Sequence, residues 1–191
     1  MDVDKLQIST EQQLIQQLQL KTPEALALLV ELYTDDVYRF IYNQVGGSVQ
    51  DTEDLVQETF LAAMKALRRF RGDSKIRTWL FSIAAHKVTD RYRHWGRRPS
   101  VPIQTVAFSL LAETPPPEQR MEHNEANRLI RQALLELPPH YRTALVLKYI
   151  EEMSVKEMAK IMHRSEKSVE SILVRARRML TSLFEGKYAG A

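Results

Sequence analysis

The sequence predicts an all-α protein of two small helical domains joined by a proline-rich linker. Apolar residues recur at steps of three and four almost everywhere along the chain, which is the spacing of one face of an α-helix. No stretch of useful length combines alternating apolar residues with the β-branched and aromatic enrichment of a strand. The helical periodicity fails at about residues 97–121, where Pro99, Pro102 and the run 115–117 prevent a continuous helix.

This break predicts domains at residues 10–96 and 122–184, with 97–121 as the linker. The chain has 191 residues, of which 44% are hydrophobic and 27% charged, and this is the composition of a globular protein of one or two domains.

Several classes of protein are disfavoured by what the sequence lacks. It contains no cysteine, and its five histidines show no HxxxH or HExxH spacing, so we expect no disulfide, metal or other cofactor. No carboxylate cluster or glycine-rich phosphate loop is visible, so we expect no catalytic residues and no enzyme. No apolar run approaches the ~18 residues of a membrane span and no signal peptide is recognisable, so we expect a cytoplasmic protein without direct membrane insertion.

Charge is segregated along the first domain. Residues 1–60 hold three basic and eleven acidic side chains, a net charge of −8, whereas residues 64–98 hold eleven basic and two acidic ones, a net charge of +9. Such asymmetry indicates two partners, a basic protein surface for the acidic part and a polyanion, first of all nucleic acid, for the basic part.

The first domain is expected to start with amphipathic helices around Leu14 and Leu18, and then around Leu26 and Leu29 beyond Pro23. A third helix is predicted from a cap at Asp51 to about Arg69. Its buried face is predicted to carry Val56, Phe60, Ala63, Leu67 and then Phe70. The opposite face is acidic and amide-bearing with one exposed apolar residue, which suits docking on a basic helical partner or is plain solvated surface. It consists of Asp54, Gln57, Glu58 and Leu61.

A fourth helix is predicted to start from a cap at Asp73 or Ser74. Its predicted inward residues are Ile76, Trp79, Leu80, Ile83, Ala84 and Val88. Its other sides interleave cations with the rings of Phe81, His86, Tyr92, His94 and Trp95. Cations neutralise phosphates and flat rings stack on unpaired bases, so this helix is suited to single-stranded nucleic acid, although Trp79 and Phe81 also fit an ordinary core. The candidate DNA-binding residues here are Arg71, Lys75, Arg77, His86, Lys87, Arg91 and Arg93.

The second domain is predicted to begin with helices at about 123–137 and 139–151. Ser154 and Glu157 then form a capping box that starts a short helix ending near His163. That helix is expected to bury Val155, Met158, Ala159 and Met162. Ser165 is expected to cap a last helix that buries Val169, Ile172, Leu173, Ala176, Leu180 and Leu183. Two helices joined by so short a turn predict a helix-turn-helix.

The exposed side of the last helix mixes cations with short hydroxyls, as a face that reads the major groove requires. The same charges on an ordinary helical hairpin would be solvated surface. The candidate DNA-reading residues are Arg164, Ser165, Lys167, Ser168, Ser171, Arg175 and Arg178.

Four stretches, in order and at fitting spacing, resemble the extracytoplasmic-function (ECF) group of bacterial RNA polymerase sigma factors. They are DTEDLVQETF at residues 51–60, FRGDS at 70–74, TWLFSIA at 78–84 and LPPHYR at 137–142, followed by the helix-turn-helix. The resemblance covers about residues 25–185 and implies the two helical domains called sigma region 2 and region 4. It implies that core RNA polymerase, promoter DNA and an anti-sigma factor are partners.

The resemblance also implies roles for the candidate residues. The face of Asp54, Gln57 and Glu58 would dock on the polymerase, the basic helix around 75–93 would melt and hold the minus-ten element, and residues 164–178 would read the minus-thirty-five element. The linker would thread through the polymerase. Two positions depart from the family pattern: His86 replaces a frequent Asn, and His163 stands at a turn position where many members have Gly.

A second hypothesis is a helix-turn-helix regulator that works without polymerase and whose first domain senses a ligand or dimerises. It explains residues 154–180 equally well but gives the basic and aromatic helix no role.

Overall fold

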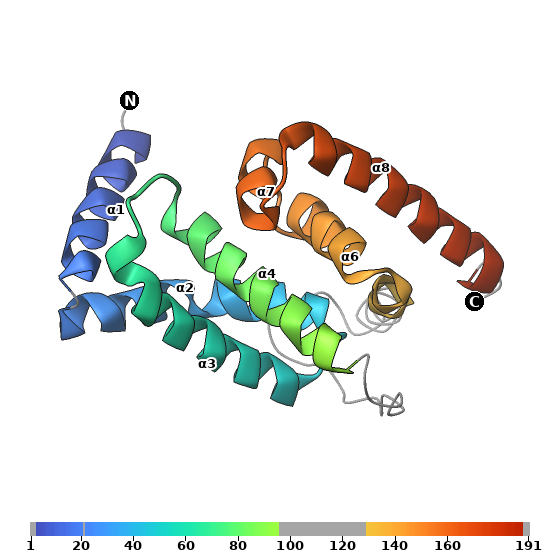
Figure 1. The fold of residues 1–191 in the computed structure, drawn as a ribbon, viewed down its shortest axis with the longest axis horizontal. Helices are drawn as coiled ribbons and strands as arrows, with labels where there is room; N and C mark the ends of the chain where they lie inside the picture. The colour runs from blue at the N-terminus through green and yellow to red at the C-terminus, as the bar shows by residue number, and fades with distance from the viewer. Residues whose placement is uncertain (1–2, 21, 96–128, 189–191) are drawn as a thin grey trace, which may run out of the picture.

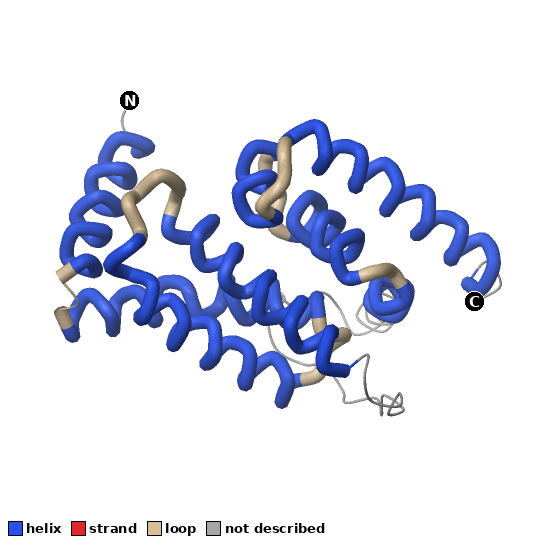
Figure 2. Tube along the Cα trace, in the orientation of Figure 1, coloured by secondary structure: helices blue, strands red, loops and turns tan. Residues whose placement is uncertain are grey.

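The computed structural model describes residues 3–20, 22–95 and 129–188, and their side chains except those of residues 3–10, 95, 187 and 188. The predicted linker at 97–121 lies outside these ranges. Within them every regular element is helical and no strand occurs (Figure 2). The predicted all-α class is therefore confirmed, while the exact domain limits remain predictions.

An N-terminal bundle contains the first four α-helices (Figure 1). They are α1 (Val3–Gln19), α2 (Pro23–Gln44), α3 (Val49–Ala66) with a 3₁₀ turn η1 (Leu67–Arg69), and α4 (Ile76–Trp95). The five residues predicted to be buried between Val56 and Phe70 are all buried, as are Leu14, Leu18 and Leu29. The helical spacing of apolar residues thus identified the core faces correctly.

Two predicted helix starts in this bundle are wrong. Ser48, not Asp51, caps α3: its Oγ accepts the Asp51 N–H at 3.3 Å, so the helix begins three residues earlier. At α4, the Ile76 N–H donates to the Glu11 carboxylate at 2.7 Å, rather than to Asp73 or Ser74. Glu11 lies 65 residues away on α1, so a tertiary contact replaces the local cap.

A C-terminal bundle contains the remaining helices. Residues 129–136 are helical, and α6 (Pro139–Leu145) continues into a wider turn, η2 (Val146–Ile150). They are followed by α7 (Val155–Met162), α8 (Glu166–Leu183) and η3 (Phe184–Tyr188). The predicted helix at 123–137 is described only from residue 129 onward, and the predicted helix at 139–151 is confirmed to within one residue.

The two bundles pack against each other, with α4 lying between α3 on one side and α6 and α7 on the other (Figure 1). Arg142 of α6 is central to this contact and is only 2% exposed. Its guanidinium donates to the carbonyls of Leu134, Leu135 and Leu137, at 2.8, 2.9 and 3.2 Å, and to that of Gln44 at the end of α2, at 2.5 Å. It also lies 4.6 Å from the centre of the Tyr92 ring of α4. One buried cation thus joins the carbonyl ends of helices from both bundles, where helix dipoles favour positive charge.

Candidate nucleic-acid and polymerase interfaces

The helix-turn-helix is formed by α7, a short turn and α8. At the start of α7, Ser154 Oγ accepts the Glu157 N–H at 3.3 Å and Glu157 accepts the Ser154 N–H at 3.0 Å, so the predicted capping box is confirmed. Hydrogen bonds from Ser154 lower the pKa of Glu157. His163 ends α7 in the left-handed region with φ 50° and ψ 50°, as a turn position that favours glycine requires.

The predicted core of this motif is confirmed in part: Ile172, Leu180 and Leu183 of α8 are only partly buried. Ser165 caps α8, and Val169, Leu173 and Ala176 are buried. Val155, Ala159 and Met162 of α7 are only partly buried, whereas Ile161, which the sequence analysis did not list, is 1% exposed.

The opposite side of α8 is open to solvent. Of the predicted reading residues, Ser165 uses its Oγ to accept the Ser168 N–H at 3.3 Å, and Ser168 is half-buried. The other five are exposed: Arg164, Lys167, Ser171, Arg175 and Arg178. Val174 lies on the same stripe and is 47% exposed, and its spacing from Ser171 and Arg178 was the signal that could have identified it.

The predicted cations of α4 are mostly paired with carboxylates of the same chain. Arg91 contacts Asp51 at 3.4 Å and Glu58 at 3.1 Å, and Lys87 Nζ lies 3.4 Å from Glu58. His86 and Arg93 both contact Asp90, at 3.1 and 3.3 Å, but their side chains remain 69% and 72% exposed. Arg71 and Lys75, before the helix, are exposed.

The aromatic residues of α4 divide between core and surface. Phe81 is fully buried and stacks on Phe40 with ring centres 4.6 Å apart, so its predicted availability to bases is wrong and the core alternative is correct. Trp79 stacks on Phe70 at 4.6 Å and is partly buried. The Tyr92 hydroxyl donates to the Gln44 carbonyl at 2.8 Å, and burial raises the pKa of Tyr92. In this arrangement Tyr92 therefore belongs to the contact between the bundles.

The predicted docking face lies on α3. Asp54, Gln57 and Leu61 are exposed, and Leu61 is an apolar side chain with 54% exposure. Glu58 differs from these three because it is already paired with Lys87 and Arg91 of α4. The structure thus brings one residue of the predicted docking face together with two of the predicted minus-ten residues.

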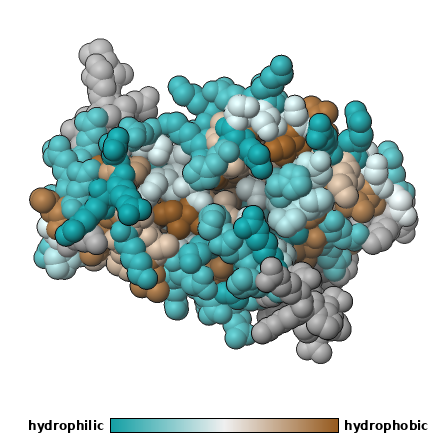
Figure 3. All heavy atoms as spheres, viewed as in Figure 1, coloured by the Kyte–Doolittle hydropathy of each residue, from teal (hydrophilic) through white to brown (hydrophobic). Residues whose placement is uncertain are grey.

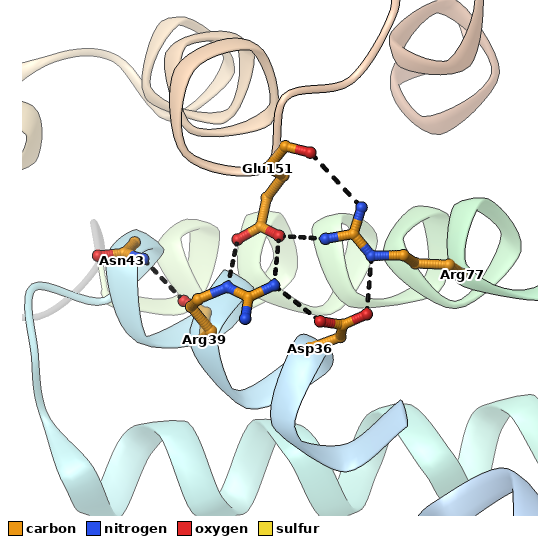
Figure 4. A network of polar contacts seen from close by, with 5 residues as sticks. All are labelled: Asp36, Arg39, Asn43, Arg77 and Glu151. Atoms are coloured by element: carbon orange, nitrogen blue, oxygen red, sulfur yellow. Dashed lines mark hydrogen bonds and ion pairs between the residues drawn. The ribbon is translucent and has the colours of Figure 1, made fainter. Parts of the chain in front are cut away.

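A cluster of two arginines and two carboxylates connects the bundles (Figure 4). Glu151, which follows η2, has a side chain with 0% exposure. Arg39 of α2 donates to both of its carboxylate oxygens at 3.3 and 3.1 Å, and Arg77 of α4 donates at 2.5 Å. Asp36 bridges the two arginines, 2.7 Å from Arg39 and 2.8 Å from Arg77, and the hydrogen bond to Glu151 raises the pKa of Arg39. Sequence reasoning missed Asp36, Arg39 and Glu151 because no local pattern links residues 112 apart.

The described part of the chain has a mixed surface. The face seen in Figure 3 is mostly hydrophilic, with smaller hydrophobic areas between. Among the described residues, no group of three His, Cys, Asp or Glu side chains could hold a metal ion. None of the described helices is both long and apolar enough to cross a bilayer.

Fold and surface together define a helix-turn-helix protein with separate acidic and cationic faces. The family model of Sigma-70 region 2 matches residues 29–98, and that of Sigma-70 region 4 matches residues 127–180. Together with relatives named as ECF sigma factors that are 31% identical over most of this chain, these matches show that the chain belongs to the ECF group of RNA polymerase sigma factors. It is a factor that binds core RNA polymerase and directs promoter recognition in transcription initiation, not a regulator that works without polymerase.

Individual relatives agree with this assignment. The chain is 31% identical over 175 residues to the ECF RNA polymerase sigma factor SigW of Bacillus subtilis, covering 87% of this chain and 92% of that protein. It is 33% identical over 174 residues to the RNA polymerase sigma-H factor of Pseudomonas aeruginosa, covering 87% and 90%. The solved structure of CnrH in complex with the cytosolic domain of CnrY matches with a TM-score of 0.67 and 28% identity, covering 93% of this chain and 98% of that one.

Proposed function

We propose that α8 reads the minus-thirty-five element from the major groove of promoter DNA. The observation that carries this proposal is the exposed cationic face of α8, opposite a buried face that fixes the helix on α7. Arg175 and Arg178 would contact phosphates or guanine edges, Ser171 could approach base edges, and Val174 could contact a thymine methyl group.

The N-terminal bundle would supply the second point of promoter contact. The residues for the minus-ten element are Arg71, Lys75, Arg77, His86, Lys87, Arg91 and Arg93, at the start of α4 and along it. Opening a duplex costs about 1.4 kcal/mol for each stacked step, and capture of unstacked bases and phosphates offsets this cost. The isolated factor would therefore bind promoters weakly and act only together with polymerase.

The acidic face of α3 would dock on core RNA polymerase. Asp54, Gln57 and Leu61 are available for a basic partner with an apolar contact point, and Glu58 would join them when Lys87 and Arg91 move to DNA. Acidic surfaces of this kind accelerate association with cationic partners and select among them.

The protein would act by binding polymerase and promoter DNA, without catalysing a reaction itself. Its place of action would be the cytoplasm. The structural neighbour CnrH is described in complex with the cytosolic domain of CnrY. By analogy we assign this chain an anti-sigma partner, which would hold it inactive until a signal releases it.

Run-off transcription with core polymerase tests the proposal. The wild-type chain is expected to confer start-site selection on polymerase that lacks a sigma factor. Asp54→Lys is expected to weaken polymerase binding about tenfold, because it places a cation against a basic partner. Glu31→Lys makes the same charge change at an exposed position of another helix, α2, and serves as the matched control. Equal polymerase binding by both variants would refute the docking face. Absence of start-site selection by the wild-type chain would overturn the function itself.

A further inference from the structure

Simultaneous reading of two promoter elements requires the two bundles to separate. The minus-ten and minus-thirty-five elements lie about 25 base pairs apart, on the order of 85 Å at ~3.4 Å for each base pair. In this structure α4, the predicted minus-ten helix, packs directly on α6 and α7 of the other bundle. The packed arrangement is therefore not the one that engages both elements.

Separation would remove Glu151 from the two arginines that hold it. Arg39 directs Nε and Nη2 at the carboxylate, while Arg77 directs Nη2 at the carboxylate and Nη1 at the Glu151 carbonyl at 3.5 Å (Figure 4). All these donors lose an acceptor when the bundles part. Asp36 stays, because it lies on α2 between the two arginines, so a neutral cluster of four charged groups becomes a site with a net charge of +1.

The vacated site has the chemistry of a phosphate site. Two guanidinium groups, converging on one point and held in place by a shared carboxylate, match the several acceptor oxygens of a phosphate. Arg77 lies in the first turn of α4, beside the positions already assigned to the minus-ten strand. DNA held along α4 would thus bring phosphates close to the site.

The backbone next to Glu151 supports a dedicated role for this carboxylate. Glu152 adopts a left-handed conformation with φ 53°, although it is not a glycine. Such a backbone conformation is strained for a residue with a side chain, and it persists where the surrounding structure imposes it. Here the turn directs Glu151 down into the N-terminal bundle (Figure 4).

We propose that Arg39 and Arg77 form a phosphate-binding site for promoter DNA, and that the Glu151 carboxylate occupies this site while the bundles are packed. This inference rests on the proposed minus-ten function of α4. Glu151 and a DNA phosphate compete for the same donors, so the second bundle restrains DNA binding by the first until the two part.

Fluorescence anisotropy of the full chain tests the competition without polymerase. The probe is a labelled oligodeoxythymidylate of about 15 nucleotides, comparable to the longer site sizes of single-strand-binding modules. Glu151→Gln removes the competing charge, and if the packed form holds ~90% of the chain, the variant binds the probe about tenfold tighter.

The double variant Glu151→Gln with Arg77→Gln separates phosphate binding from simple opening. Both variants release the bundles, but only the single variant keeps both arginines. The double variant is expected to bind the probe more weakly than E151Q. Its plot of log K against log salt concentration is expected to have a slope shallower than that of E151Q by ~0.7, because one phosphate contact is lost. Equal affinity and equal salt slope for E151Q and the double variant would overturn the proposal, as would equal probe binding by E151Q and wild type.

A second way to open the contact leaves the arginine cluster intact. A Cβ at Gly46 would lie 2.3 Å from a terminal methyl group of Leu135 in the other bundle, so Gly46→Ala forces that side chain to shift and is expected to loosen the contact and to raise probe affinity. Gly72→Ala is the matched control, because Gly72 has a similar φ of +76° but its nearest side-chain atom would be 3.7 Å away. Run-off transcription by the wild-type chain is scored separately, so a negative binding result would refute the competition and leave the sigma function intact.

Discussion

The two helices assigned to promoter DNA, α4 and α8, differ in how they hold their cations. On α8 the side chains of Lys167, Arg175 and Arg178 are exposed, on a face that none of the other described helices covers. On α4, Lys87 and Arg91 contact carboxylates of α3, and Arg77 is held by Asp36 and Glu151.

This difference suggests an order of events. The face of α8 is preformed and can engage duplex DNA without rearrangement of its own bundle. The face of α4 has to exchange internal partners for phosphates, so its contribution comes later and depends on what separates the bundles. Exposed ion pairs contribute about 0–1 kcal/mol each, which makes the exchange at Glu58 inexpensive, whereas the buried pairs of Glu151 are harder to break.

The largest expected effect concerns Arg142, which holds the two bundles together. Arg142→Ala removes the guanidinium hydrogen bonds to four carbonyl groups and its packing between the bundles, although the Gln44 carbonyl keeps the Tyr92 hydroxyl and the Leu134 carbonyl keeps the Leu137 N–H as donors. We therefore expect a loss of about 3 kcal/mol in the free energy of unfolding. Urea denaturation measures it, with Arg178→Ala on the exposed face of α8 as control, expected within ~0.5 kcal/mol of wild type. Equal losses for the two variants would show that burial of Arg142 contributes nothing to stability.

A smaller effect is expected from the cations of α4 themselves. Replacing Lys87 and Arg91 with Ala would remove two of the proposed phosphate contacts, so promoter opening should slow about tenfold while first binding to duplex DNA changes little. Permanganate reactivity of unpaired thymines follows the opening. Lys65→Ala, an exposed cation at the end of α3, is the control. Promoter opening at the wild-type rate would refute the proposed role of the α4 cations, and with it the contrast between α4 and α8.

The smallest expected effect lies in the turn before α8. His163→Gly relieves the left-handed strain at φ 50°, offset in part by the greater freedom of glycine in the unfolded chain, for a net gain of about 0.5 kcal/mol. Glu152→Gly at φ 53° makes the same change away from the recognition helix. Thermal unfolding compares the two, and a loss of stability in both would contradict the strain attributed to these positions.

Much of the helix-turn-helix could be predicted because its signals are local. Ser154 with Glu157, and Ser165 with the Ser168 N–H, are bonds between residues three apart, so sequence spacing alone specifies them. The same reasoning predicted the wrong cap for α4, because the group that accepts its Ile76 N–H belongs to Glu11 of another helix.

The candidate sites also divide into features set by local spacing and features set by contacts between helices. Residues of α8 shared one face by helical spacing, and the structure leaves that face exposed. Phe81 showed the limit of this reasoning: its position beside cations resembled a base-stacking site, yet contact with Phe40 places it in the core. Whether a side chain on a helix points to solvent or to a second bundle depends on the second bundle.

By itself the sequence determined the helical class, the faces of the main helices and the segregation of acidic and basic charge. These properties depend on periodicity and on bonds within one or two turns, which a linear chain already contains. Only the tertiary structure decided which cations are covered, because Arg39, Arg77 and Glu151 are brought together by the packing of two bundles. Ion pairs between residues 74 and 112 positions apart follow from shape complementarity over the whole contact, and no local spacing encodes them.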